Sequence, residues 1–180
     1  VLNDGRIIYS RWEYVDRPAI PIQSLWAINP DGTNVSGVFG NRCLEPGTFM
    51  EAKSIGATRK LLCVLAGHNG SCRGAIAIID TQYGANAQKG ITNLTPELPL
   101  KKTTEGNGNG LCRKGPYENP FPIDETHFFV SREGTILLRD YKGTEQVTVI
   151  RGGSKMGYYS PLPLRVTKAP PVLRSLLPEG

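Results

Sequence analysis

A short strand-and-turn pattern occurs three times in this chain of 180 residues, and it limits the fold more than any other feature. In each copy an apolar stretch ends at Asn or Asp, and a glycine-bearing turn follows. The copies are Leu25–Thr33, Ala75–Asp80 with its turn at Gly84, and Thr135–Thr144. Their starts lie about 50 and 60 residues apart, near the period of about 40 to 50 residues for propeller blades with insertions. The repeat therefore indicates an all-β chain built from similar sheet units.

The segments around each copy predict short antiparallel strands, because they are rich in β-branched and aromatic residues and are bounded by turn residues. Four strands per unit is the make-up of a propeller blade. We therefore expect a partial β-propeller over residues 1–167, with about three four-stranded antiparallel blades at 5–40, 47–95 and 119–151 plus flanking segments. The first blade lacks its innermost strand. The expected strands are Arg6–Ser10, Ser24–Asn29, Val35–Phe39, Thr48–Lys53, Lys60–Leu65, Gly74–Ile79, Gly90–Leu94, Pro120–Ile123, His127–Ser131, Thr135–Arg139 and Gln146–Ile150.

Three blades are fewer than the four to eight of closed propellers, and they would leave open sheet edges, which proteins avoid. We therefore expect that the chain is part of a longer protein or that it self-associates to cover its open blade edges. The extended piece Tyr158–Leu164 is a candidate start of a further blade. Residues 168–180, with three prolines, are expected to form a Pro-rich exit arm.

Charge and hydropathy argue against two classes of partner. The formal net charge is +5, the basic residues are scattered, and no run of basic residues is longer than two, as at Lys101-Lys102. Without a basic stripe that also carries aromatic residues, nucleic acid is not an expected partner. No stretch approaches the roughly 18 apolar residues of a membrane helix, so no membrane span is predicted.

The four cysteines bear on the compartment. Cys63 lies in an apolar run and is expected in the core, whereas Cys43, Cys72 and Cys112 lie in glycine-rich loops. Loop cysteines fit an oxidising compartment, which favours a periplasmic or otherwise extracytoplasmic protein. Three alternatives are open: one disulfide that includes Cys72, three free thiols, or a metal site that combines His68 with Cys72. Zinc takes three or four Cys or His ligands, and the chain has no Cys-x-x-Cys pair.

Blade geometry places several connecting loops on one face of a propeller. The residues expected to share this face are Arg11, Trp12, Glu13, Tyr14, Asp16, Arg17, Cys43, His68, Cys72 and Cys112. The first six form either the rim of a ligand site or a loop fastened to the core by Arg–carboxylate pairs. Glu51, on an innermost strand, is a candidate cation or water ligand in a central channel, or part of a solvated channel wall. His127 is expected on the opposite face in a structural role.

Two segments carry a resemblance to a known family. Gly5–Arg17 followed by Leu25–Thr33 resembles the TolB-like (WD40-like) β-propeller repeat. The combination of Arg11-Trp12-Glu13-Tyr14 with the Asn29–Thr33 turn is most similar to the middle domain of the hydrazine synthase alpha subunit and its relatives in planctomycete-type bacteria. Three later stretches support the resemblance: Gly67–Gly70 leading into Gly74–Asp80, Gly115–Pro122 and Ser160–Arg165.

The resemblance implies a secreted or periplasmic multidomain protein with cytochrome c-type domains elsewhere. The haem-binding motif Cys-x-x-Cys-His is missing from this sequence, so haem c is expected only on other domains, and no cofactor is expected within this segment. What the resemblance implies for this segment is the propeller scaffold.

The sequence also lacks the motifs of serine hydrolases, zinc proteases, phosphate-binding loops and dinucleotide-binding folds. We therefore expect a non-catalytic β-propeller scaffold or interaction module of a larger extracytoplasmic protein, with neighbouring domains or protein subunits as partners. The alternative is a component of a redox enzyme, an oxidoreductase subunit similar to hydrazine synthase, with a metal or ligand site on the Cys/His loop face. A third option is a carbohydrate or small-ligand binder that uses Trp12 and Tyr14.

Overall fold

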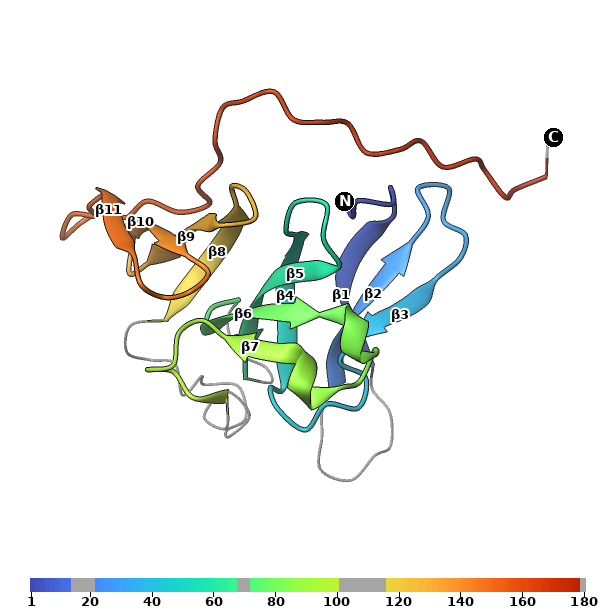
Figure 1. Cartoon of the computed structure of the whole chain (residues 1–180), viewed down its shortest axis with the longest axis horizontal. Helices are drawn as coiled ribbons and strands as arrows, with labels where there is room; N and C mark the ends of the chain where they lie inside the picture. Colours follow the sequence, from blue (N-terminus) through green and yellow to red (C-terminus); the bar gives the residue numbers. More distant parts are fainter. Residues whose placement is uncertain (14–21, 68–71, 101–115, 179–180) are drawn as a thin grey trace.

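The computed structural model describes residues 1–13, 22–67, 72–100 and 116–178, and in them the chain is all-β, as expected (Figure 1). The strands are β1 (Ile7–Glu13), β2 (Ile22–Ile28), β3 (Ser36–Phe39), β4 (Thr48–Ser54), β5 (Lys60–Ala66), β6 (Ala75–Asp80), β7 (Ile91–Asn93), β8 (Tyr117–Pro122), β9 (His127–Arg132), β10 (Thr135–Asp140) and β11 (Gln146–Ile150). Two short 3₁₀ helices, η1 (Thr81–Tyr83) and η2 (Gln88–Gly90), lie between β6 and β7.

The strands form three successive groups, in which chain neighbours pair antiparallel. We name them unit 1 (β1–β3), unit 2 (β4–β7) and unit 3 (β8–β11). The expectation was three separate blades, the first of them without its innermost strand. Unit 1 has three strands, as expected, but a parallel pairing of Gln23 with Thr48 joins β2 to β4, so that units 1 and 2 form one seven-stranded sheet instead of two separate blades. Unit 3 is a separate four-stranded sheet.

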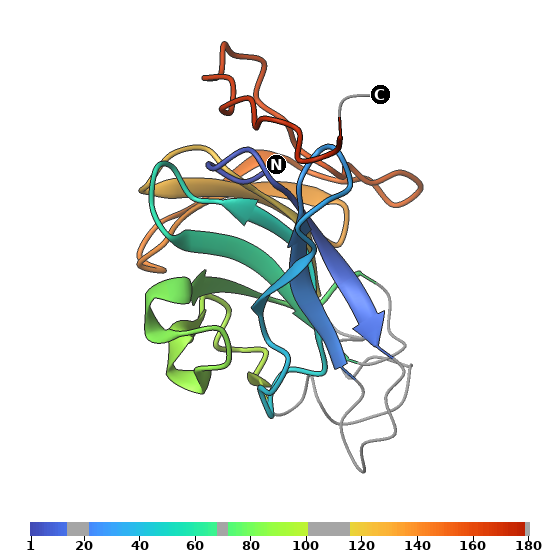
Figure 2. The same ribbon diagram turned by 90° about the vertical axis from the view of Figure 1, so that its right-hand side faces the viewer.

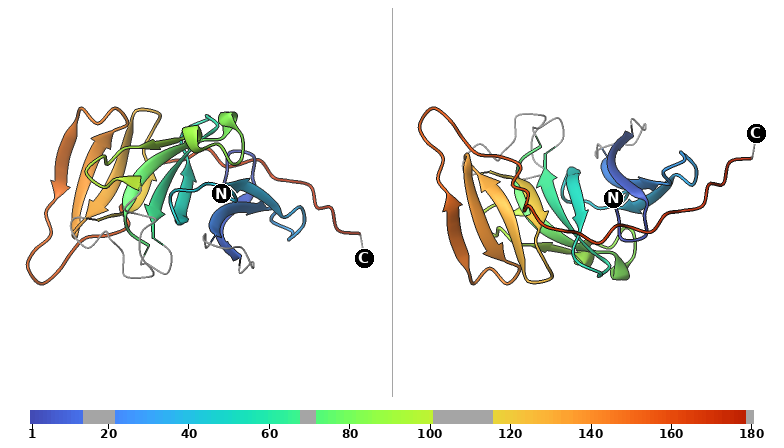
Figure 3. Two further views of the ribbon diagram at one scale, coloured as in Figure 1. Left: turned by 90° about the horizontal axis from the view of Figure 1, so that it is seen from below. Right: turned by 90° about the horizontal axis from the view of Figure 1, so that it is seen from above.

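Unit 2 is buried on both faces, and its strand β5 shows why. Successive side chains of a strand point to opposite faces of the sheet. Leu61, Cys63 and Leu65 pack in a core shared with unit 1, whereas Leu62 and Val64 pack in a second core shared with unit 3. The uninterrupted apolar run of β5 therefore fills two cores, and unit 2 lies between the other two units (Figure 3).

The C-terminal segment after Ile150 crosses the molecule without forming a strand. It leaves unit 3, passes over one side of the sheets and reaches unit 1 (Figures 1 and 2). The backbone N–H of Tyr158 donates to the carbonyl of Gly134 over 2.7 Å, and the N–H of Leu176 donates to Asp31 Oδ2 over 2.7 Å. The segment thus links the first and last units, and its stretch Tyr158–Leu164, a candidate strand, is not a regular strand here.

Candidate functional site

The first strands of units 2 and 3 share a local irregularity. In β4 the pairing with β5 is interrupted between Met50 and Lys53, and in β8 the pairing with β9 is interrupted between Glu118 and Phe121. Within these bulges Glu51 has φ 53° and Asn119 has φ 51°. Residues other than glycine seldom adopt positive φ, so two such residues at matching positions indicate a repeated bulge.

A buried aromatic residue stands two positions before each of these bulge residues. Phe49 and Tyr117 are each 1% exposed. The ring of Phe49 packs edge-on against Phe39 with a centroid distance of 5.6 Å. The Tyr117 hydroxyl donates to Glu97 over 2.7 Å, and burial together with this hydrogen bond raises the pKa of Tyr117 to about 12. We call this combination, an aromatic residue and then a left-handed residue two positions later, the first-strand motif.

The C-terminal segment contains a third copy of the first-strand motif, at Tyr158 and Ser160. Ser160 has φ 51°, like its two counterparts. The N–H of Tyr158 donates to the carbonyl of Gly134, just before β10, as the N–H of Tyr117 donates over 2.8 Å to the carbonyl of Gly74, just before β6. The sequence expectation that a further unit starts here therefore has a structural counterpart, although no neighbouring strand pairs with the segment in the described residues.

A second pair of contacts confirms that Tyr158 is equivalent to the buried aromatic residues. Ser10 Oγ in β1 donates to the carbonyl of Phe49 over 2.7 Å, and Ser131 Oγ in β9 donates to the carbonyl of Tyr158 over 2.9 Å. In both cases a serine of one unit holds the aromatic residue of the next first-strand motif. The segment that contains Tyr158 thus makes the same contact with unit 3 as β4 makes with unit 1.

The left-handed residues of the three copies are joined by hydrogen bonds. Asn119 Nδ2 donates to Glu51 Oε1 over 2.9 Å, and the backbone N–H of Ser160 donates to Asn119 Oδ1 over 3.2 Å. Glu51 Oε2 is buried and has no hydrogen-bond partner among the described residues. Burial and the nearby charge of Glu51 raise the pKa of Glu118. Glu51, predicted as a channel residue, therefore links β4 to β8 through its Oε1. Its other carboxylate oxygen, Oε2, is not used in this link.

The predicted loop face is described only in part, because Tyr14, Asp16, Arg17, His68 and Cys112 lie outside the described residues. Arg11 Nε is 3.3 Å from Glu13 Oε1, and the Arg11 guanidinium lies 4.4 Å from the centre of the Trp26 ring. This is one of the Arg–carboxylate pairs expected if the loop is fastened to the sheet. Trp12 is 56% exposed. Strand register places Trp12 of β1 and Ala66 of β5 at the same end of the sheet, since Trp12 pairs with Gln23, Gln23 with Thr48, and Thr48 with Ala66.

The cysteines of the described residues carry free thiols. Cys43 and Cys63 are buried, Cys72 is exposed, and no disulfide joins Cys43 to Cys72. Burial raises the pKa of Cys43 to about 11 and that of Cys63 to about 12, so both remain thiols at neutral pH. In the described part of the chain no group of three or more His, Cys, Asp or Glu residues is placed to hold a metal ion. The predicted pairing of Cys72 with His68 stays a prediction.

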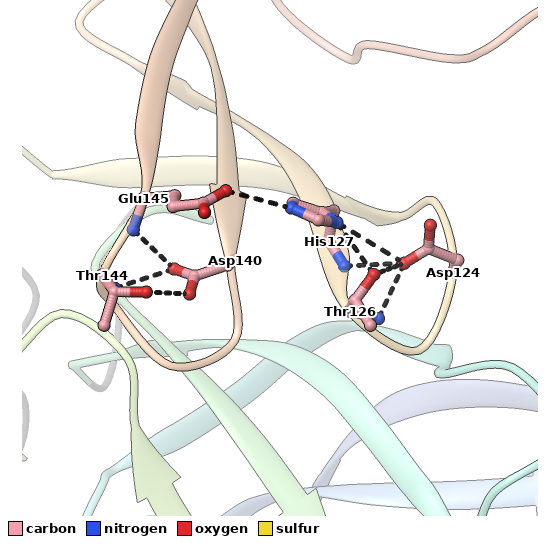
Figure 4. Close-up of polar contacts among 6 residues, drawn as sticks. All are labelled: Asp124, Thr126, His127, Asp140, Thr144 and Glu145. Atoms are coloured by element: carbon pink, nitrogen blue, oxygen red, sulfur yellow. Dashed lines mark hydrogen bonds and ion pairs between the residues drawn. The ribbon is translucent and has the colours of Figure 1, made fainter.

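A polar cluster on unit 3 lies between two turns (Figure 4). Asp124 Oδ1 accepts from the backbone N–H of His127 over 2.7 Å and from the Thr126 hydroxyl over 2.6 Å. His127 Nε2 is 3.5 Å from Glu145 Oε2. A cavity of about 310 Å³ opens beside these residues. His127, expected in a structural role, thus links the β8–β9 turn to the β10–β11 turn.

Turn formation accounts for the carboxylates of this cluster. Asp140 Oδ2 accepts from the Thr144 hydroxyl over 2.6 Å, and its Oδ1 accepts from the N–H groups of Thr144 and Glu145 over 2.9 and 3.0 Å. The Thr144 hydroxyl and these N–H groups lower the pKa of Asp140 to about 2. Asp124 is likewise held by its own turn, and its pKa is lowered first by the Thr126 hydroxyl. These groups therefore shape the two turns.

The two outward faces of the array carry apolar side chains that the sequence interpretation did not single out. On unit 3 the register aligns Phe121, Phe129, Leu138 and Val147 in one row across all four strands. This row lies opposite the core that holds Phe128, Val130 and Leu137. On unit 1 the corresponding pairs are Ile7 with Ile28 and Tyr9 with Trp26. We call these two surfaces the unit 1 end face and the unit 3 end face.

The end faces are partly open to solvent. Val147 is 57% exposed on the unit 3 end face, and Ile7 is 42% exposed on the unit 1 end face. The equivalent face of unit 2, which meets unit 1, is closed: Leu61, Cys63 and Ile79 are at most 5% exposed. The sequences of β9 and β10 could have revealed the end faces, because apolar residues follow one another in these strands and therefore point to both faces of the sheet.

Among the described residues, no helix has the length and apolar character needed to cross a membrane. Comparison of the chain with protein-family models, with curated proteins and with solved structures finds no significant match.

Proposed function

We propose that this chain is part of a β-propeller and serves as a non-catalytic scaffold, or docking module, for neighbouring domains or subunits of a larger extracytoplasmic protein. The observation that carries the proposal is the pair of partly exposed apolar end faces on an array whose middle unit is buried on both sides. Apolar patches of this kind on folded proteins mark interaction sites.

The propeller arrangement is supported by the way successive units pack. Phe49 of unit 2 lies against Ser10 of unit 1, and Tyr117 of unit 3 shares a core with Val64 of unit 2. Each first strand therefore contacts the preceding unit, as the blades of a propeller do around an axis. The resemblance to TolB-like repeats adds the extracytoplasmic location and the larger parent protein to the proposal.

A photo-crosslinking experiment tests the docking role. A benzoylphenylalanine placed at Val147, on the unit 3 end face, should crosslink to a defined partner domain or subunit when the protein is expressed in its native cells. The same probe at Tyr83, which is 53% exposed in η1, is the matched control. Crosslinks of equal yield at Val147 and Tyr83 would contradict the proposal. So would the absence of crosslinks both at Val147 and at Ile7, a position on the unit 1 end face that is probed in the same way.

The alternative, a redox-enzyme component with a metal on the loop face, rests on His68 and Cys72 and has no supporting contact in the described residues. Metal analysis of the purified protein separates it from the scaffold proposal. Stoichiometric zinc, copper or iron that is lost in a Cys72→Ser variant would favour the enzyme component. Substoichiometric metal in the unsubstituted chain would count against it.

A further inference from the structure

The third first-strand motif points to a specific docking partner. We propose that Tyr158–Leu164 is the innermost strand of a composite blade, whose other three strands are β1–β3 of a second copy of this chain. The inference rests on the proposed propeller arrangement and extends it, because it names the partner and the strand pairing.

The first step is that unit 1 has a free strand edge where the other units have a first strand. β5 pairs with β4, and β9 pairs with β8. β1 occupies the equivalent position in unit 1, because Ser10 of β1 and Ser131 of β9 make the same contact with the following motif. Among the described residues β1 pairs with β2 alone. Unit 1 therefore offers three strands without the first, and Tyr158–Leu164 is a first strand without the other three.

The second step is that Tyr158 is incompletely covered. Its counterparts Phe49 and Tyr117 are each 1% exposed, because strands of their own unit and of the preceding unit enclose them. Tyr158 is already held by unit 3 but is 42% exposed. Leu162, four positions later, is 74% exposed. Ser131, which donates to the carbonyl of Tyr158, lies on the same face of β9 as Phe129, so Tyr158 lies at the unit 3 end face, where a following unit would pack.

The third step is that a second copy, and not the same molecule, supplies the missing strands. Units 1 and 3 lie at opposite ends of the array with unit 2 between them (Figure 3). Closing one chain on itself would give a ring of three blades, fewer than the four to eight of known propellers. Two copies that exchange their Tyr158–Leu164 segments give six, which lies within that range. Such an exchange about a twofold axis closes the assembly and leaves no unit open.

The internal repeat also fixes the register of the proposed pairing. Phe49 pairs with Leu65 in β5, and Tyr117 pairs with Arg132 in β9. The position equivalent to these partners in β1 is Arg11, one residue after Ser10. By the same equivalence Leu162 would pair with Ile8, as Phe121 pairs with Phe129. The partner's strand would thus add to the free edge of β1 by backbone hydrogen bonds, in the manner of β-strand addition.

The two end faces that would meet in the proposed dimer both carry apolar and aromatic side chains. The unit 1 end face presents Tyr9 and Trp26, and the unit 3 end face presents Phe129 and Leu138. In the proposed dimer these two faces meet, as the facing sides of units 1 and 2 meet in the core that holds Leu25 and Leu61. The apolar surface left open in the single chain is then buried at two identical interfaces.

Mixed single-cysteine chains test the register. Arg11→Cys and Tyr158→Cys are made in separate chains, both in a Cys72→Ser, Cys112→Ser background, and are mixed and oxidised. We expect a disulfide-linked dimer in which mass spectrometry finds residue 11 joined to residue 158. The matched control replaces Tyr158→Cys with Val172→Cys, a position of the same segment that is 98% exposed and outside the motif. Equal yields from both mixtures would overturn the proposed pairing.

Sedimentation velocity of the unsubstituted 180-residue chain tests the assembly itself. We expect a dimer that Leu162→Asp weakens at least about tenfold, as loss of one buried leucine side chain predicts. Val172→Asp should leave the dimer unchanged. A chain that stays monomeric at every concentration overturns this inference, while photo-crosslinks from Val147 to another protein would still support the docking role. A dimer that crosslinks to no other protein supports the inference and counts against the wider docking role.

Discussion

Asn29 and Asp140 hold the same position in two copies of the repeated turn, yet they use different atoms. Asn29 Nδ2 donates to the Thr33 hydroxyl over 3.1 Å, whereas the Asp140 carboxylate accepts from Thr144 and Glu145. In unit 1 the accepting carboxylate is Asp31, which bonds Thr33 over 2.7 Å. The same backbone turn is therefore stabilised by the Asn29 amide together with the Asp31 carboxylate in one copy and by the Asp140 carboxylate in the other.

Asp140 should make the stability of the protein sensitive to acid. Its pKa is about 2 in the folded protein against 3.8 for an ordinary Asp, so the carboxylate stabilises the fold above pH 4. That contribution is lost as the pH falls from about 4 toward 2. We expect Asp140→Asn to unfold with a smaller change in urea midpoint between pH 5 and pH 3 than the unsubstituted chain, in line with linkage of protonation to folding.

Thr144→Ala provides the companion measurement. It keeps the carboxylate but removes the hydroxyl that contributes most to the lowered pKa, so the pKa of Asp140 in the folded protein should rise toward 3.8, and the acid-induced loss of stability should be smaller and end at a higher pH. An unchanged pH profile in both variants would show that Asp140 does not couple folding to protonation.

At the scale of elements, the close packing of units depends on glycine positions as well as on strands. Gly40 follows β3 with φ +99°, and a Cβ there would lie 2.5 Å from the ring of Phe49. Gly84 has a similar φ of +101°, but nothing lies within 4 Å of a Cβ built on it. The two glycines therefore separate the cost of the backbone conformation from the cost of a clash with the first-strand motif.

We expect Gly84→Ala to destabilise the fold by about 1–3 kcal/mol, the cost of forcing a residue with a side chain into a glycine-only conformation. Gly40→Ala should cost about 1–3 kcal/mol more, because the added methyl group displaces the buried Phe49 ring. Urea denaturation of both variants measures the difference. Equal losses of stability would mean that the Phe49 ring can move aside without cost, and that unit 1 and unit 2 are less tightly packed than the structure indicates.

The elements were largely predictable from the sequence, and their relations were not. Every expected strand up to Ile150 is present, with boundaries shifted by a few residues, because β-branched runs bounded by turn residues are a local signal. The first-strand motif was missed because its left-handed position holds Glu51, Asn119 and Ser160, which share no residue type. The parallel pairing of Gln23 with Thr48 was missed because it depends on how units pack.

The features of the candidate site also divide into local ones that the sequence predicts and long-range ones that it does not. The Arg11–Glu13 pair was predictable because its members lie two residues apart on one strand. The row from Phe121 to Val147 depends on the register of four strands, which local sequence does not specify. The expected disulfide that includes Cys72 rested on loop position alone, and in the structure Cys43 is buried and both Cys43 and Cys72 carry free thiols.

At the scale of the whole molecule, stability should be highest in the middle of the array. β5 is buried at every residue except its first, whereas all five residues of β11 are exposed. In a stack of similar units each unit gains stability from its neighbours, and unit 2 has two neighbours while the others have one. The array is therefore expected to open from its ends.

Native-state hydrogen exchange measures this gradient, since amides exchange according to the free energy of the smallest opening that exposes them. We expect the amides of β5 to exchange slowest and those of β11 fastest, with β9 and β10 in between. Leu62→Ala removes a side chain that unit 2 places in the core shared with unit 3, and it should cost about 2–5 kcal/mol. Exchange should then accelerate in β8–β10 more than in β1 and β2, which pack on the opposite face of unit 2. Uniform acceleration across all three units would instead mean that the array unfolds as one cooperative body. The end units would then not open more easily than unit 2, and a docking partner would not stabilise them more than the rest of the array.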